Sequence, residues 1–109
     1  MKTIKYDKLV RDEIPKIIES SGKTCKTRVL SDEEYIIMLD KKLDEELLEY
    51  RKDKTAEELA DLIEVIYALA KAQGVTVEQL ESIRAKKCSE RGAFDRKIFL
   101  ESVNELSDL

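Results

Sequence analysis

The sequence predicts an all-α fold, and three observations favour it. Apolar residues recur at helical spacing along most of the chain, three capping signals precede such runs, and only three Gly and one Pro interrupt them. With 109 residues and no internal repeat, we expect a single domain over residues 1–109. A chain of this length buries a modest share of its surface, so a homodimer or higher homo-oligomer is expected to enlarge the core.

The first predicted helix is short. Pro15 is tolerated only in a first turn, so this helix begins near Asp12 and ends before Gly22. Residues 23–30 follow as extended chain or a small strand.

Two longer helices come next. Ser31 and Glu34 form a capping box, which predicts a helix over 31–52. Thr55 and Glu58 form a second box, which predicts a helix over 55–73 that ends at Gly74. The short connection makes these two helices an antiparallel hairpin, and two hairpins from two copies would form a four-helix bundle.

A fourth helix completes the predicted set. Thr76 and Gln79 form a third capping box, so this helix runs from there to Gly92. The remaining tail is expected to add a short extended or helical piece.

Composition excludes several function classes. The chain has 24 acidic and 20 basic residues, a balance that argues against a dedicated nucleic-acid binder. It has no secretory segment and no apolar run of membrane-spanning length. Cys25 and Cys88 match no metal or redox spacing, so we expect free thiols in a reducing cytoplasm. Histidine is absent, so any chemistry must use other side chains or a metal.

The acids of the segment LDEELLEY, residues 43–50, form one flank of their helix. At about 100° per residue, Glu45, Glu46 and Glu49 occupy a contiguous arc beside the apolar stripe. That predicted core stripe consists of Ile36, Leu39, Leu43, Leu47 and Tyr50.

Two further acids follow in EELAD, residues 57–61. The core stripe predicted for this helix consists of Leu59, Leu62, Ile63, Ile66 and Ala70. Glu58 and Asp61 lie on the flank that also carries Val65, Ala68 and Leu69, so we expect apolar neighbours to enclose them partly. A carboxylate removed from water needs a partner.

Antiparallel packing would bring both acidic flanks together. Two like charges ~4 Å apart repel by ~4 kcal/mol at an effective dielectric of ~20, so a cluster requires protonation or a cation. Mg²⁺ prefers such carboxylate oxygens and keeps waters for phosphate groups. The alternative is an ordinary surface, in which Glu58 only caps its helix and Glu45 and Glu49 pair with Lys41, Lys42 or Arg51.

The pattern Glu45-Glu46-x-x-Glu49 with Glu58-x-x-Asp61 resembles the metal signature of the all-α nucleoside triphosphate pyrophosphohydrolases, the superfamily of MazG, dimeric dUTPases and phosphoribosyl-ATP pyrophosphohydrolase. The segments KLVRDEIPKII, TRVLSDEEY, EELADLIEVIYAL and ERGAFDRKIFL look like its small house-cleaning branch, so the resemblance covers about residues 8–100. In that superfamily the connection between the two acidic motifs is commonly longer than the eight residues that separate Glu49 from Glu58 here.

The resemblance implies Mg²⁺-dependent hydrolysis of standard or damaged (d)NTPs to a nucleoside monophosphate and pyrophosphate, with Mn²⁺ as a substitute ion. It implies that Glu46, Glu49, Glu58 and Asp61 hold the metal. Glu45 would orient or deprotonate the attacking water, or help to hold a further ion. It also assigns phosphate contacts to Lys87 and Arg91.

Lys8 and Arg11 are a second candidate pair for phosphate, the alternative being a solvated surface or an ion pair with Asp12. Two other functions stay open. One is a non-catalytic helical module that dimerises or binds a partner protein, and the other is a phosphohydrolase acting on phosphoribosyl-ATP.

Overall fold

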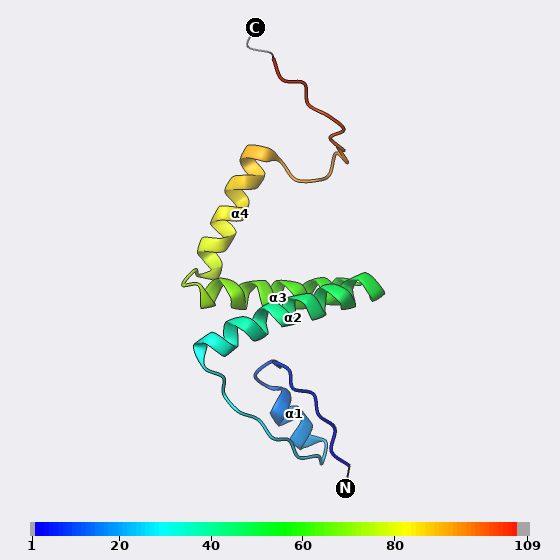
Figure 1. Ribbon diagram of the computed structural model, residues 1–109, viewed down its shortest axis with the longest axis vertical. Helices are drawn as coiled ribbons and strands as arrows, with labels where there is room; N and C mark the ends of the chain where they lie inside the picture. The colour runs from blue at the N-terminus through cyan, green and yellow to red at the C-terminus, as the bar shows by residue number, and fades with distance from the viewer. Residues whose placement is uncertain (1, 107–109) are drawn as a thin grey trace. The chain divides into compact units, whose positions relative to one another are not determined.

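The computed structural model describes residues 2–106, and these residues form an all-α structure (Figure 1). Four helices and no strands occur in the described part of the chain, which confirms the predicted fold class. The helices are α1 (Ile14–Ser20), α2 (Asp32–Asp53), α3 (Ala56–Ala72) and α4 (Val77–Arg91). None of the described helices is long and apolar enough to cross a membrane.

The start of α2 is a complete capping box, as predicted. The Ser31 Oγ accepts a hydrogen bond from the Glu34 backbone N–H at 3.2 Å, and the Glu34 carboxylate accepts one from the Ser31 N–H at 3.4 Å. Arg28 adds two hydrogen bonds to the same carboxylate at 2.9 and 3.3 Å. Hydrogen bonding from Arg28 and Ser31 lowers the pKa of Glu34 to about 2. This network fixes the residue at which α2 begins.

The other predicted helix ends are close to those observed. Thr55 precedes α3, and its hydroxyl accepts a hydrogen bond from the Glu58 N–H at 3.3 Å. After Ala72 the chain reaches Gly74, whose φ of +81° suits glycine and stops the helix. α4 begins one residue after Thr76 and ends one residue before Gly92.

Two predicted segments are neither helix nor strand. Residues 23–30 are irregular, and so are residues 92–106 apart from one turn. In the tail, the side chains of Phe94, Ile98 and Phe99 are 97%, 74% and 86% exposed, so no packing supports a regular element there.

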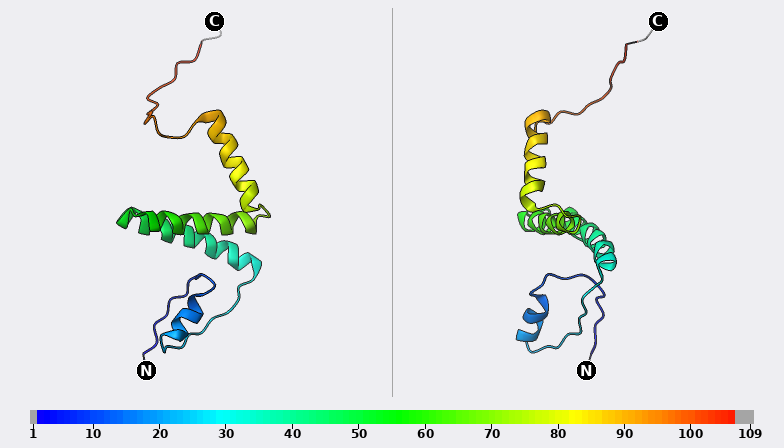
Figure 2. Two further views of the ribbon diagram at one scale, coloured as in Figure 1. Left: turned by 180° about the vertical axis from the view of Figure 1, so that it is seen from behind. Right: turned by 90° about the vertical axis from the view of Figure 1, so that its left-hand side faces the viewer.

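The chain divides into two compact units, one ending at Val77 and the other beginning at Glu78. That the two units make up a single domain stays a prediction. Within the first unit, α2 and α3 lie side by side as an antiparallel hairpin (Figures 1 and 2). Lys54, in the left-handed conformation with φ of 51°, and Thr55 make the tight turn between them.

The core between α2 and α3 is small. Among the described residues, Leu39, Val65 and Ala70 are buried, and Leu39 is the most enclosed at 2% exposure. The predicted α2 stripe is mostly correct, because Leu43, Leu47 and Tyr50 are half-buried beside Leu39.

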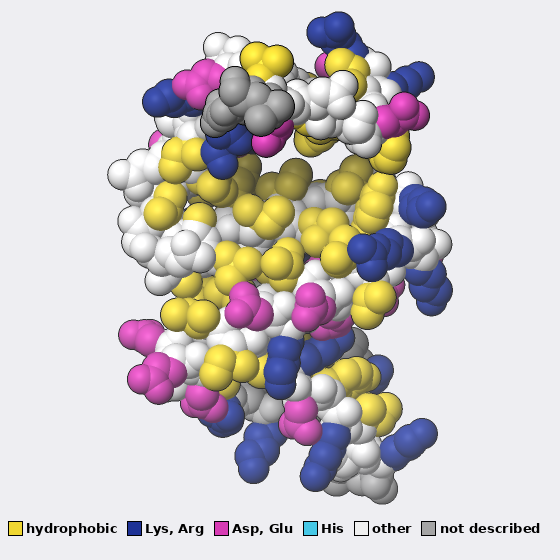
Figure 3. Space-filling view, turned by 45° about the horizontal axis from the view of Figure 1, so that its top comes forward, with side chains coloured by type: hydrophobic (Ala, Val, Ile, Leu, Met, Phe, Trp, Pro, Cys, Tyr) yellow, Lys and Arg dark blue, Asp and Glu magenta, His cyan; other side chains and the backbone are white. Residues whose placement is uncertain are grey.

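The predicted core stripe of α3 is largely wrong. Leu59, Ile63 and Ile66 are 46%, 47% and 41% exposed, whereas Val65 on the acidic flank is buried against α2. The helix carries two apolar stripes about 100° apart, and α2 covers only one of them. Hydrophobic side chains therefore gather uncovered on the surface, as Figure 3 shows in yellow.

Candidate metal centre

Five carboxylates from α2 and α3 converge across the hairpin. The side chains of Glu46, Glu58 and Asp61, all half-buried, each place an oxygen atom within 4.8 Å of the others. Glu49, Asp53 and Glu58 form a second group that meets the same distance limit. Glu58 belongs to both groups, so the two overlap. All four acids predicted to bind metal are therefore brought into this cluster.

Asp53 is the member that the sequence analysis missed. The predicted helix ended at about Lys52, which placed Asp53 in the loop, but α2 continues through Asp53. Asp53 follows Glu49 by four residues, and this spacing places both side chains on one helix face. The four-residue spacing of Glu49 and Asp53 was visible in the sequence, but it indicates a shared face only if the helix extends one residue beyond Lys52.

Three cations neutralise part of the acidic surface. The Arg11 Nη2 lies 2.6 Å from the Asp61 Oδ1, and the Lys42 Nζ lies 3.4 Å from the Glu46 Oε1. Lys42 also reaches the Glu45 Oε2 at 3.4 Å, and Lys8 reaches the Glu45 Oε1 at 3.4 Å.

The remaining three acids have no such partner. In residues 2–106, Glu49, Asp53 and Glu58 form no ion pair with a basic side chain. The cluster thus keeps uncompensated negative charge at the loop end of the hairpin.

Glu45 lies beside the two groups and belongs to neither. The surface interpretation describes part of its environment correctly, because Glu45 does pair with Lys42 along the helix. Its side chain is 37% exposed, which leaves it accessible to water at the edge of the cluster. Its assignment to the attacking water stays a prediction.

The electrostatic consequence is clearest at Glu58. Loss of hydration raises the pKa of Glu58 above its ordinary value of 4.5, and the nearby charges of Asp61, Asp53, Glu49 and Glu46 raise it further. A divalent cation would remove this penalty, since it adds positive charge among the five carboxylates. Oxygen donors of this kind suit Mg²⁺ or Mn²⁺, and the residues present therefore fit such an ion.

The raised pKa of Glu58 predicts a pH dependence of stability in the metal-free chain. Because the folded state binds this proton more tightly than the unfolded state, Glu58 favours folding at low pH. Its contribution is lost as the pH rises from 4.5 through the raised pKa. Thermal melts across this range should show that Glu58→Gln gains stability relative to wild type as the pH rises. A constant difference between the two proteins would contradict the assigned shift.

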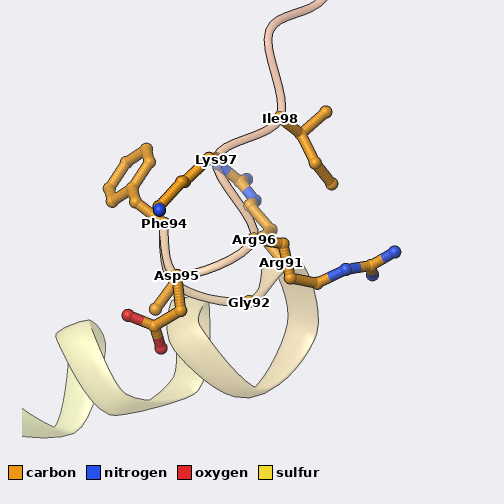
Figure 4. Close-up of a pocket in the computed structure, with 8 residues that line it drawn as sticks. Arg91, Gly92, Phe94, Asp95, Arg96, Lys97 and Ile98 are labelled. Atoms are coloured by element: carbon orange, nitrogen blue, oxygen red, sulfur yellow. The ribbon is translucent and has the colours of Figure 1, made fainter.

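Lys87 and Arg91 lie on exposed turns of α4, four residues apart. They belong to the second unit, so their predicted role at the phosphates stays a prediction. Arg91 also lines a pocket of about 220 Å³ formed by residues 91–98. The Arg91 side chain extends away from those of Phe94 and Asp95, which lie on the other side of this turn (Figure 4).

Comparisons with known proteins add one partial relative. No protein-family model matches the chain, and no solved structure matches it significantly. An uncharacterized protein of Mycolicibacterium smegmatis (strain ATCC 700084 / mc(2)155) is 55% identical over 47 residues, which are 43% of this chain and 48% of that protein. The match therefore spans about half of each chain. The resemblance to the pyrophosphohydrolases stays a prediction.

Proposed function

We propose that this protein is a Mg²⁺-dependent nucleoside triphosphate pyrophosphohydrolase that releases a nucleoside monophosphate and pyrophosphate. The observation that supports the proposal is the pair of carboxylate groups that share Glu58 across α2 and α3. Three of their five acids have no basic partner in the described chain, and the pKa of Glu58 is raised. Such an arrangement is costly without a cation and suits one well.

The two carboxylate groups would bind two metal ions. Glu46, Glu58 and Asp61 would hold one ion, and Glu49, Asp53 and Glu58 would hold a second. When bound, Mg²⁺ offsets negative charge on the phosphates and activates water.

The chain's own groups would position the reactants. Glu45, at the edge of the cluster, would orient the attacking water or accept its proton. Lys87 and Arg91 would contact the phosphates, because cationic side chains form strong charge-assisted hydrogen bonds with them. Carboxylates on two packed helices keep a fixed separation, which favours a reaction that depends on positioning. None of these roles requires the histidine that this sequence lacks.

A nucleotide panel tests the proposal directly. The full chain is incubated with Mg²⁺ and each standard or damaged (d)NTP, with phosphoribosyl-ATP as an additional substrate. Products are identified by ³¹P NMR in ¹⁸O-enriched water, which also locates the phosphorus that is attacked. Pyrophosphate and a monophosphate are expected. Orthophosphate as the product, or no turnover with any substrate, would refute the assignment.

The uncovered apolar stripe of α3 favours a second role, in protein association. We propose that a second copy of the chain covers Leu59, Ile63 and Ile66, forming the four-helix bundle expected of paired hairpins. The small core within one hairpin supports this proposal, since a second hairpin would bury side chains that are now about half exposed. A helical module that only binds a partner would use the same surface and show no turnover in the panel.

Ile63→Lys should dissociate the dimer. A buried lysine without a partner opposes association, whereas the same side chain is tolerated where Ile63 is exposed in a single copy. Light scattering coupled to size exclusion should report a dimer for wild type and a monomer for Ile63→Lys. Glu64→Lys, at an exposed position on the other side of the same helix from Leu59 and Ile66, serves as the control and should stay dimeric. A monomeric wild type at about 100 µM would refute the association, because the dissociation constants of stable dimers lie well below that concentration.

A further inference from the structure

The basic residues of the segment KLVRD reach the acidic cluster from outside the hairpin. Lys8 and Arg11 precede α1 in irregular chain, 37 and 50 residues before their partners Glu45 and Asp61. Both partners come from the predicted catalytic and metal-binding set. The sequence suggested that Lys8 and Arg11 bind phosphate or pair with Asp12, but the structure pairs them with carboxylates of the candidate centre.

The two contacts differ from that of the third cation, Lys42. Lys42 is part of α2 itself and its side chain is 17% exposed, so the helix holds it beside Glu45 and Glu46. Lys8 and Arg11 are 42% and 56% exposed, and they lie in irregular chain before α1, not on either helix of the hairpin. Half-exposed ion pairs of this kind contribute little net free energy. They can therefore be exchanged at low cost.

We propose that Arg11 is a positioning residue that serves as a counter-cation of the cluster in the metal-free chain, while Lys8 pairs with Glu45 beside it, and that a divalent cation displaces Arg11 from Asp61. This inference rests on the proposed function, because it requires a cation to bind the cluster. Asp61 is the residue at which the competition occurs. It accepts the Arg11 hydrogen bond at 2.6 Å and also belongs to the group with Glu46 and Glu58.

The displaced guanidinium has a second use. A cation among Glu46, Glu58 and Asp61 repels Arg11 and weakens its attraction to the acids. A guanidinium released at the edge of the centre can instead bind phosphate oxygens through two parallel hydrogen bonds. The segment would then hold the acids in the empty centre and contact the substrate in the loaded one.

Limited proteolysis measures the displacement without relying on activity. Trypsin cleaves after Lys and Arg, and an arginine held by Asp61 is a poor substrate. In wild type, adding Mn²⁺ should speed cleavage after Arg11 relative to cleavage after Lys23, an exposed residue in irregular chain, by at least about threefold. Asp61→Asn should already be cleaved rapidly after Arg11 without metal.

Calorimetry with Mn²⁺ gives an independent readout. Removing the competing cation in Arg11→Gln should tighten Mn²⁺ binding by about threefold to fivefold, the scale of one half-exposed ion pair. Lys16→Gln removes the same charge from an exposed position of α1. It should change the Mn²⁺ affinity less than twofold, which is close to the error of the measurement.

The outcomes separate this inference from the proposed function. If wild type binds Mn²⁺ but the ratio of the two cleavages is unchanged at saturation, the displacement is refuted and the metal site stands. The displacement is refuted in the same way if Arg11→Gln binds Mn²⁺ no more tightly than Lys16→Gln does. If wild type binds neither Mn²⁺ nor Mg²⁺, both the proposed function and the displacement are refuted.

Discussion

Glu58→Gln is expected to abolish divalent-cation binding and to lower nucleotide turnover by at least about 100-fold, because loss of even a supporting residue around a metal commonly costs 10- to 100-fold. Glu58 is the carboxylate that both acidic groups share, so one substitution removes an oxygen donor from each. The amide has nearly the same shape but carries no charge. Calorimetry with Mn²⁺ and the nucleotide assay measure the two losses.

The matched control is Glu57→Gln, a neighbouring acid that is exposed and outside both groups. It removes the same charge and should retain binding and turnover. Glu58→Gln should also fold as well as wild type, since the neutral amide avoids both the loss of hydration and the repulsion that raise the pKa of Glu58. Retained metal binding in Glu58→Gln, or equal losses in both variants, would contradict the metal centre. Loss of helical circular dichroism would instead indicate a structural role for Glu58.

Leu39→Ala should destabilise the chain by about 2–4 kcal/mol, the usual range for removing a buried leucine side chain. Leu39 is 2% exposed and lies in the contact between α2 and α3. Because small domains are stable by only about 5–15 kcal/mol, such a loss would be a large share of the total. Urea unfolding followed by circular dichroism measures the change.

Leu48→Ala is the control on the same helix, with a leucine that is 64% exposed. It should shift the free energy of unfolding by less than about 0.5 kcal/mol. If Leu39→Ala lowered the free energy of unfolding as little as Leu48→Ala is expected to, Leu39 would not be part of the core. A large effect of Leu48→Ala would instead indicate that an associating copy covers that face.

The helices themselves follow from local chemistry. The residues at which α2, α3 and α4 begin were predicted to within a residue or two, because capping side chains bond to backbone only a few positions away. The C-terminal stop of α3 was predicted from Gly74 for the same reason. No such signal predicts a regular element in residues 92–106, and these residues are exposed and irregular apart from one turn.

Four of the five acids in the cluster were predicted from the sequence, and the fifth was not. Helical angles placed Glu46, Glu49, Glu58 and Asp61 on facing flanks, and the hairpin brings Glu58 close to Glu46 and Asp61 in one group and to Glu49 in the other. Asp53 was missed because its inclusion depends on the last residue of a helix, where prediction is least accurate. The role of Glu45 at the attacking water was assigned by resemblance, and the structure places Glu45 outside both carboxylate groups.

The sequence by itself therefore determined the helices, their caps and the acidic flanks, because these depend on contacts between residues close along the chain. Only the tertiary structure decided which apolar stripe of α3 meets α2, and which cations reach the cluster. Val65 is buried while Ile63 is exposed, although both are β-branched residues of one helix. Arg11 finds Asp61 across 50 residues. The spacing of apolar residues predicts which faces of a helix are hydrophobic. Which of those faces is buried depends on packing between segments that are distant in the sequence.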